Sequence, residues 1–328
     1  MNYEESLKQF ELLFNHQMSD EEMYALLSGL RLDENTDENT IAAAAKVMRS
    51  HSIPLHVSPS IKDKLIDIVG TGGDKIGSFN VSSTVALLVA SAGIYVAKHG
   101  SRSVTSKSGS ADMFEKLGIR LDLSTQNSAK LLEETGFTFM FAQNYHPAMK
   151  FIMPIRKSIP DKTIFNVLGP LTNPASVKKT LLGVFDKSFV SKLAHALHVS
   201  DSTDALVVSS AEHMDEISIS DITYAARLKN GSINEFIIDP LEYAIKRAPL
   251  SAIIGGDGEE NAQILRDIFD NRATDAQRDI VLINAAAAFI VDGMARDFQD
   301  GLQIAKEQLL SGKAKAKLEQ IIKVSSAL

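Results

Sequence analysis

The sequence contains no cysteine and no tryptophan among its 328 residues. Without cysteine, the chain cannot form disulfides, thiolate nucleophiles, cysteine-based zinc sites or iron–sulfur clusters. Any metal ion must therefore be bound by oxygen atoms or by some of the eight histidines. The rest of the composition, 45% hydrophobic and 23% charged, is typical of a globular protein that buries a large core.

Long hydrophobic runs are also missing. The longest, 85–90 and 285–291, fall far short of the roughly 18 residues that a membrane span needs. The first residues, Met1 to Glu5, have neither the basic start nor the apolar stretch of a secretory signal. We therefore expect a cytoplasmic protein that does not contact a membrane.

The chain has no excess of positive charge. It has 34 Lys and Arg against 41 Asp and Glu, which gives a formal net charge of −7. This balance argues against a protein that coats DNA, RNA or an anionic membrane. A polyanionic partner would have to bind at a local basic patch.

The spacing of apolar residues divides the chain into two kinds of structure. Up to about residue 65 the spacing predicts helices, and Ser19 with Glu22 forms a capping box at the start of the second one. From Leu65 onward, short strands alternate with helices, which predicts a parallel sheet with crossover helices. Asn230-Gly231 predicts a hairpin, and the chain is helical again from about residue 262.

Acidic residues are absent from 75–111, although the protein as a whole is acidic. The same region carries four cations and many hydroxyl groups, and seven of the 19 glycines lie between Gly70 and Gly109. This composition is expected where several phosphate oxygens are hydrogen-bonded, although an ordinary surface loop is the simpler alternative. The cations are Lys75, Lys98, Arg102 and Lys107.

The glycine-rich turn Gly70 to Asp74 follows a predicted strand and leads into a helix that begins near Ser82. Glycines there let the backbone approach a ligand and aim its N–H groups at an anion. Two common nucleotide motifs are missing, because Gly77 is followed by Ser78 without the lysine of a Walker A loop, and Lys75 stands where a dinucleotide fingerprint needs its third glycine.

Asp215 and Glu216 are adjacent carboxylates that follow the predicted strand around Val207. Such a pair is often simply solvated. Beside a phosphate site it becomes a plausible Mg²⁺ holder, because Mg²⁺ takes one or two carboxylates together with substrate oxygens and water.

Taken together, the motifs of this chain resemble those of the anthranilate phosphoribosyltransferase family, in order and in spacing over nearly the whole length. The matching segments are Gly70 to Asp74, Phe79 to Ser83, Lys98 to Ser103, Lys107 to Asp112, Phe165 to Leu171, and Asp215-Glu216.

The resemblance implies an α/β fold of the nucleoside phosphorylase and phosphoribosyltransferase type. It would comprise a small helical domain, residues 1–66 and about 159–182, and a larger α/β domain with a mostly parallel sheet, residues 67–158 and 183–328. The implied assembly is a homodimer through the helical domains. The implied reaction transfers phosphoribosyl from 5-phosphoribosyl 1-pyrophosphate to anthranilate, giving N-(5-phosphoribosyl)anthranilate and pyrophosphate, in tryptophan biosynthesis.

The resemblance also implies the site residues. Ser82, Asp215 and Glu216 would bind Mg²⁺, and Gly70, Ser101 and Arg156 would bind anthranilate. The cations Lys98, Arg102 and Lys107 would stabilise the leaving pyrophosphate, and no general base is identified. The residues implied for phosphoribosyl pyrophosphate are Gly70, Gly73, Asp74, Ser78, Asn80, Val81, Ser82, Ser83, Lys98, His99, Gly100, Ser101, Arg102, Ser103, Val104, Thr105, Ser106 and Ser110.

Three positions depart from the pattern of the family. Ser78 and Ser83 replace threonine and keep the hydroxyl group. Ser101 replaces an asparagine used for anthranilate, and a hydroxyl cannot reproduce the donor and acceptor reach of an amide. The alternatives are a pyrimidine nucleoside phosphorylase of the same fold and a non-catalytic relative that binds nucleic acid through the basic loop.

Overall fold

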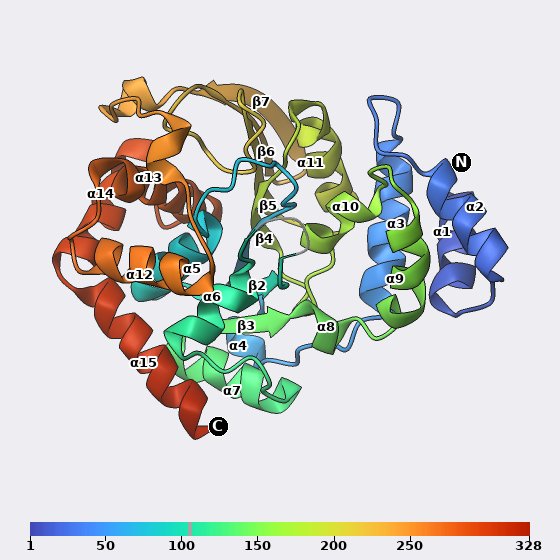
Figure 1. Cartoon of the computed structure of the whole chain (residues 1–328), viewed down its shortest axis with the longest axis horizontal. Coiled ribbons are helices and arrows are strands. Elements are labelled where there is room, and N and C mark those ends of the chain that lie inside the picture. Colours follow the sequence, from blue (N-terminus) through green and yellow to red (C-terminus); the bar gives the residue numbers. More distant parts are fainter. Residues whose placement is uncertain (104–106) are drawn as a thin grey trace.

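A seven-stranded sheet forms the centre of the molecule, which is described by a computed structural model over residues 1–103 and 107–328 (Figure 1). The strand order is β3-β2-β1-β4-β5-β6-β7. The first five of these are parallel, and β6 and β7 are added antiparallel at one edge. The strands are β1 Leu65–Gly70, β2 Tyr95–Gly100, β3 Phe137–Phe141, β4 Lys179–Gly183, β5 Asp204–Ser210, β6 Thr223–Lys229 and β7 Ser232–Ile238.

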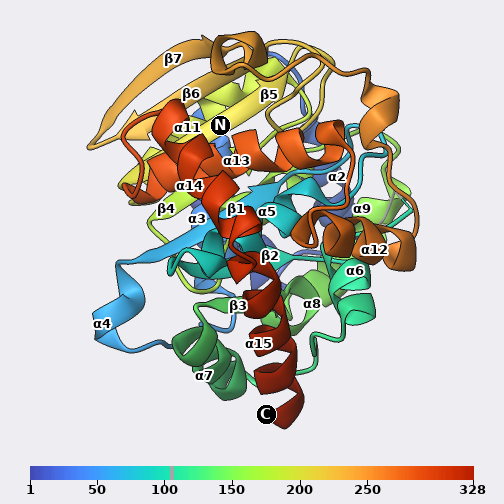
Figure 2. The ribbon, with the colours of Figure 1, turned by 90° about the vertical axis from the view of Figure 1, so that its left-hand side faces the viewer.

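Helices cover both faces of this sheet, so the central strands are buried on both sides and read as continuous apolar runs. In β4, Leu181 packs into one core with α5 and α13, while its neighbour Leu182 packs into another with α3 and α11. Helices α13, α14 and α15 all contact α5 on the first face (Figures 1 and 2). The bounds are α3 Glu38–Ser50, α5 Val81–Ser91, α11 Val190–Val199, α12 Gly258–Phe269, α13 Asp275–Asp292, α14 Phe298–Leu310 and α15 Lys313–Ala327.

The N-terminal helices gather on one side of the molecule, far from α12 to α15 (Figure 1). The predicted capping box is confirmed, because Ser19 Oγ accepts from the Glu22 N–H and Glu22 Oε2 accepts from the Ser19 N–H. Helix α3 packs on α1, and α9 packs on α1 and α2. The bounds are α1 Tyr3–Phe14, α2 Asp20–Gly29 and α9 Met149–Ser158, which contains Pro154.

The packing places two segments differently from the domain boundaries predicted above. Helix α9 was predicted to belong to the α/β domain. It lies against the N-terminal helices, because its apolar residues are buried against α1 and α2. Residues 179–182, predicted with the helical part, belong to β4 and pair with β1 and β5. The division of the chain into two domains stays a prediction.

The remaining helices are short or lie at the ends of the sheet. None of the helices in the described ranges is long and apolar enough to cross a membrane. The predicted hairpin is confirmed, since β6 and β7 pair across Asn230-Gly231. The bounds are α4 Pro59–Lys62, α6 Ser110–Leu117, α7 Thr125–Thr135, α8 Ala142–Tyr145, α10 Phe165–Leu168 and the 3₁₀ turns η1 Gly169–Leu171, η2 Lys187–Phe189, η3 Pro240–Tyr243 and η4 Leu250–Ile253.

Because five strands are parallel, their carboxyl ends meet at one edge of the sheet. Strands β1, β2 and β4 end there in Gly70, Gly100 and Gly183, and α5 begins at the same edge. Ligands of open α/β sheets bind outside the carboxyl ends of the strands. This edge is therefore the place to look for a site, and it is where the motifs from the sequence meet.

Candidate active site

Two glycines make room for one carboxylate at this edge. A Cβ on Gly70 would overlap the Asp215 carboxylate, and a Cβ on Gly183 would overlap the Asp215 carbonyl group. The Gly72 N–H then donates to Asp215 Oδ2 at 2.6 Å. A backbone N–H group of the glycine-rich turn is thus hydrogen-bonded to a carboxylate of the protein itself, that of Asp215.

Glu216 lies against the start of α5. Its Oε1 accepts from the Ser82 N–H at 2.9 Å, where the free N–H groups of a helix N-terminus favour negative charge. The structure therefore brings together Ser82, Asp215 and Glu216, which come from segments more than 130 residues apart in the chain. Their role toward a metal stays a prediction.

The two carboxylates are held in surroundings that oppose their charge. Burial, followed by repulsion from Asp74, raises the pKa of Asp215 to about 7. Burial, followed by repulsion from Asp215, raises the pKa of Glu216 well above its usual value. A bound cation would relieve this repulsion. The donors are all oxygen atoms, as Mg²⁺ prefers, so the residues present fit this ion.

The protein alone supplies an incomplete shell for such an ion. In residues 1–103 and 107–328, no group of three or more His, Asp or Glu side chains is arranged to hold a metal. An Mg²⁺ ion held by Asp215, Glu216 and Ser82 would therefore complete its shell with water and substrate oxygens, which is common for sites that also bind phosphates.

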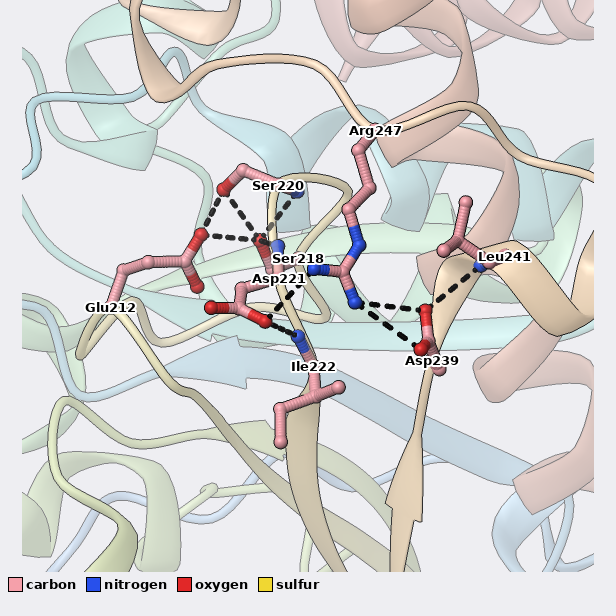
Figure 3. Close-up of polar contacts among 8 residues, drawn as sticks. All are labelled: Glu212, Ser218, Ser220, Asp221, Ile222, Asp239, Leu241 and Arg247. Carbon is pink, nitrogen blue, oxygen red and sulfur yellow. Dashed lines mark hydrogen bonds and ion pairs between the residues drawn. The ribbon is translucent and has the colours of Figure 1, made fainter.

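The loop 211–222, which connects β5 to β6 and carries the carboxylate pair, is fixed by polar contacts near its start and its end (Figure 3). Ser218 Oγ donates to Glu212 Oε1 at 3.1 Å, and Ser220 Oγ also donates to that oxygen. Arg247 bridges Asp221 and Asp239, and so ties the loop to the segment after β7. These contacts add to the backbone hydrogen bond from the Ala211 N–H to the Ile222 carbonyl at the base of the loop.

At its inner end the same loop is held by Asn284 of α13. Its Oδ1 accepts from the Ile217 N–H and its Nδ2 donates to the Ile217 carbonyl, both at 2.9 Å. Asn284 is buried, so these bonds are shielded from water. The backbone next to Glu216 is thus fixed directly by a helix of the core.

The first turn of α5 is joined to the loop before α6. Ser83 Oγ donates to Ser110 Oγ at 2.9 Å, and Ser108 Oγ donates to Asn80 Oδ1 at 3.2 Å. Asn80 Oδ1 also accepts from Asn261 of α12 at 2.8 Å. Predicted phosphate-binding residues from two segments therefore lie side by side. Ser78 pairs in an isolated bridge with Ile254, and Val81 is buried in the core.

Lys98, at the end of β2, is buried rather than turned toward solvent. Its Nζ donates to the Ile68 carbonyl and lies 3.4 Å from Ser82 Oγ. Burial lowers the pKa of Lys98, while the charges of Asp67, Glu216 and Asp215 oppose that effect. Lys98 therefore offsets the carboxylates of the site from within the protein, and its predicted role toward the phosphates stays a prediction.

Two buried histidines lie beside Lys98. His99 Nδ1 lies 3.2 Å from the Gly169 carbonyl and therefore donates to it, so its Nε2 accepts from His146 Nε2, also at 3.2 Å. Burial lowers the pKa of His99 to about 3 and that of His146 to about 4, so both rings are neutral at physiological pH.

Arg102 is paired with carboxylates just past the acid-free region. Its guanidinium lies 2.8 Å from Asp112 and 3.0 Å from Glu115. Asp112 also accepts from the Ser103 N–H and from the Gly109 N–H. The charge of Arg102 is therefore balanced by these two carboxylates, and its predicted role toward a phosphate stays a prediction. The predicted residues Val104, Thr105 and Ser106 lie outside the described residues.

The predicted anthranilate residues are not joined in the described structure. Arg156, on α9, makes its one side-chain hydrogen bond within residues 1–103 and 107–328 to Met153 Sδ at 3.9 Å. Burial lowers the pKa of Arg156, as expected for a cation without a carboxylate partner. Ser101 touches the start of α6, where its carbonyl accepts from the Ala111 N–H at 3.3 Å. Gly70 ends β1, the strand that pairs with β2, and lies beside Asp215.

The sequence patterns missed several residues of this edge. Asp67 is an acidic residue within an apolar strand, and Asn284 is a polar residue within an apolar helix. Both patterns are recognisable signals for a buried polar group with a specific partner. Asp67 accepts from Asn173 at 2.7 Å and from the His99 N–H at 3.2 Å. No pattern pointed to His146 or to Lys162, which donates to the Gly73 carbonyl at 3.1 Å.

Comparison with known proteins places this site in a family. Residues 62–315 match the family model described as "Glycosyl transferase family, a/b domain". The anthranilate phosphoribosyltransferase of Xanthobacter autotrophicus is 43% identical over 319 residues, which cover 97% of this chain and 91% of that protein. That of Azorhizobium caulinodans is 41% identical, over 100% of this chain and 94% of that protein.

Solved structures agree with this match. The crystal structure of anthranilate phosphoribosyltransferase from Thermus thermophilus has a TM-score of 0.91 at 35% identity, and covers 99% of this chain and 96% of that chain. The Saccharomyces cerevisiae enzyme in complex with PRPP and Mg has a TM-score of 0.87 at 28% identity, and covers 99% and 93%. Fold, motifs and identity agree over the whole length, and the chain belongs to the anthranilate phosphoribosyltransferase family.

Proposed function

We propose that this protein transfers the phosphoribosyl group of 5-phosphoribosyl 1-pyrophosphate to the amine of anthranilate, in tryptophan biosynthesis. The products are N-(5-phosphoribosyl)anthranilate and pyrophosphate. One observation carries the proposal: Asp215 and Glu216 are hydrogen-bonded to the glycine loop and to the first turn of α5, where the phosphates of a substrate can share a cation with them. The identity of 41–43% to relatives of that activity supports it.

In the proposed reaction, the amine forms a bond to the anomeric carbon of ribose while the bond to pyrophosphate breaks. When bound, Mg²⁺ would be held by Asp215, Glu216 and Ser82 and would neutralise the charge that develops on the pyrophosphate. The first turn of α5 and the serines packed against it would hold the phosphates through hydroxyl and backbone N–H groups. Arg156 would bind the anthranilate carboxylate, with Gly70 and Ser101 beside the ring.

The nucleophile is a neutral aromatic amine, so its position relative to the anomeric carbon matters more than its activation. The neutral His99–His146 pair is 3.2 Å between ring nitrogens and lies next to Lys98 at the end of β2. Because both rings remain uncharged, they add no positive charge near the place where the neutral amine would bind.

The experiment that tests this proposal removes the charge of the carboxylate pair. We expect Asp215→Asn with Glu216→Gln to abolish turnover at Mg²⁺ concentrations that saturate the unaltered enzyme. Asp122→Asn is the control, because Asp122 is a carboxylate paired with Arg120 on the surface. Unchanged turnover in the double variant would show the proposed metal role to be wrong. Phosphorolysis of thymidine or uridine without pyrophosphate would instead favour a nucleoside phosphorylase.

We further propose that the protein is a cytoplasmic homodimer that pairs through its small helical domain and binds neither membrane nor nucleic acid. The helical side exposes large apolar side chains that a partner would cover: Leu12 is 40%, Tyr24 45% and Phe151 50% exposed. Sedimentation should give twice the mass of one chain, and Leu12→Glu should shift the protein toward the monomer. A monomer at micromolar concentration would contradict the proposed assembly.

A further inference from the structure

Two of the three cations predicted to meet the pyrophosphate, Lys98 and Arg102, already have partners in the protein. Lys98 is buried and donates to the Ile68 carbonyl, and Arg102 is paired with Asp112 and Glu115. The edge nevertheless carries the negative charges of Asp74, Asp215 and Glu216, and the donor substrate would bring more. Mg²⁺ alone leaves a net negative site, so a further cation at this edge would favour binding.

Lys162 is placed to supply that charge. Its Nζ donates to the Gly73 carbonyl at 3.1 Å and lies 3.3 Å from the centre of the Phe185 ring, just past the end of β4. Burial, followed by the like charge of Lys75, lowers the pKa of Lys162, while the charges of Asp186, Asp74 and Asp215 oppose that effect. The group thus lies on the glycine loop, near the proposed metal ligand Asp215, and is only partly buried.

The backbone of Lys162 is held by the connection between α2 and α3. Its backbone carbonyl accepts from the Leu32 N–H at 2.9 Å, and the neighbouring Thr163 forms a bridge with Arg31. The backbone is therefore anchored to the connection between α2 and α3, while the side chain extends to the glycine loop after β1. A cation held at both ends loses little conformational freedom when an anion binds.

We propose that Lys162 is a substrate-binding residue whose ammonium group binds the pyrophosphate group of the donor at the Gly70 to Asp74 loop. This inference rests on the proposed function. Lysine suits such a role because its ammonium group binds phosphate oxygens as a point charge with three donors. One donor can stay on the Gly73 carbonyl while another meets a phosphate oxygen. The hydrogen bond to Gly73 and the charge are separate properties, and they can be tested separately.

Three substitutions separate these properties. Lys162→Arg keeps the charge, Lys162→Gln keeps a donor for the Gly73 carbonyl but removes the charge, and Lys162→Met removes both. A charge-assisted hydrogen bond of ordinary strength predicts that Gln and Met each raise the KM for phosphoribosyl pyrophosphate by about tenfold to hundredfold. The KM for anthranilate should stay unchanged, and the Arg variant should recover most of the loss.

The matched control is Lys192→Gln. Lys192 also lies against an aromatic ring, that of Phe189, and donates to backbone carbonyls, including that of Thr36 at 2.9 Å. It lies on α11, and none of these partners belongs to the glycine loop. We expect this variant to bind both substrates like the unaltered protein.

A second readout does not depend on turnover. Calorimetric titration with pyrophosphate and Mg²⁺ should show the same weakening for the Gln and Met variants, and full binding for the control. If Lys162→Gln binds pyrophosphate like the unaltered protein and only Lys162→Met binds it more weakly, Lys162 holds the glycine loop in place and does not bind the ligand. That result would overturn the proposal. A rise in the KM for anthranilate alone would overturn it as well. Failure of the proposed function is distinguishable, because the unaltered protein would then show no turnover at all.

Discussion

Gly183 offers a direct test of how closely the Asp215 loop must be placed. In Gly183→Ala, the new Cβ would lie 3.1 Å from the Asp215 Cα and would overlap the carbonyl carbon and oxygen of the same residue. Backbone atoms cannot rotate away as a flexible side chain does. The peptide after Asp215 must therefore retreat, and with it the carboxylates that are hydrogen-bonded to Gly72 and Ser82.

The size of the effect follows from this displacement. A shift of roughly 1 Å in a positioned group costs about a hundredfold in rate, so we expect kcat/KM at fixed Mg²⁺ to fall by about that factor. Overpacking of this kind costs about 1–3 kcal/mol in stability, so most of the variant should remain folded. Gly183 has a backbone conformation open to alanine, so the loss would be steric and not conformational.

The assay is the loss of anthranilate fluorescence, with circular dichroism to confirm that the variant is folded. The control is Gly29→Ala at the end of α2, where a new Cβ meets no atom within 4 Å. That variant should keep full activity and gain about 0.4–1 kcal/mol in stability from the reduced freedom of the unfolded chain. A folded Gly183→Ala variant with activity within twofold of the original would show that catalysis does not depend on the placement of Asp215 by Gly183.

Three further outcomes follow from the charges and donors of the site. The pKa of Asp215 is raised to about 7, so its ionisation destabilises the metal-free protein as the pH rises from about 4 to 7. Mg²⁺ should therefore raise the melting temperature more at pH 8 than at pH 6. In the variant Asp215→Asn with Glu216→Gln, Mg²⁺ should not raise the melting temperature. Burial lowers the pKa of His99 to about 3 and that of His146 to about 4, so stability should fall as the pH drops from 6.5 toward 4. The fall should be up to about 1.4 kcal/mol per pH unit for each ring. In a variant with Gln at both positions, the free energy of unfolding measured with urea should depend less steeply on pH. Ser101→Asn should lower the KM for anthranilate, because an amide donates and accepts with a longer reach, and an unchanged KM would argue against contact with the acceptor.

Much of the fold could be predicted because local rules and tertiary packing agree. The capping box at Ser19, the hairpin at Asn230-Gly231 and the parallel sheet follow from residue types that favour one structure. Strand β3 was not predicted, although it is a run of apolar and aromatic residues, because a short run of that kind does not distinguish a strand from a buried helix.

The site was predictable where the chain itself carries the signal. Glycines before a helix and an adjacent carboxylate pair indicated phosphate and metal chemistry, and the structure brings Ser82, Asp215 and Glu216 together. Partnerships across the fold were not visible. The absence of acidic residues in 75–111 predicted a basic region for phosphates, but it did not reveal that carboxylates a few residues beyond pair with Arg102, or that Lys98 is buried. Charge along a sequence does not report charge in space.

Transfer of phosphoribosyl to anthranilate can be followed in a single assay. The protein is mixed with anthranilate, phosphoribosyl pyrophosphate and Mg²⁺, and anthranilate fluorescence is followed while pyrophosphate release is measured in the same sample. We expect a loss of fluorescence that requires all three components, with one pyrophosphate released for each anthranilate consumed. Constant fluorescence at high enzyme concentration would contradict it.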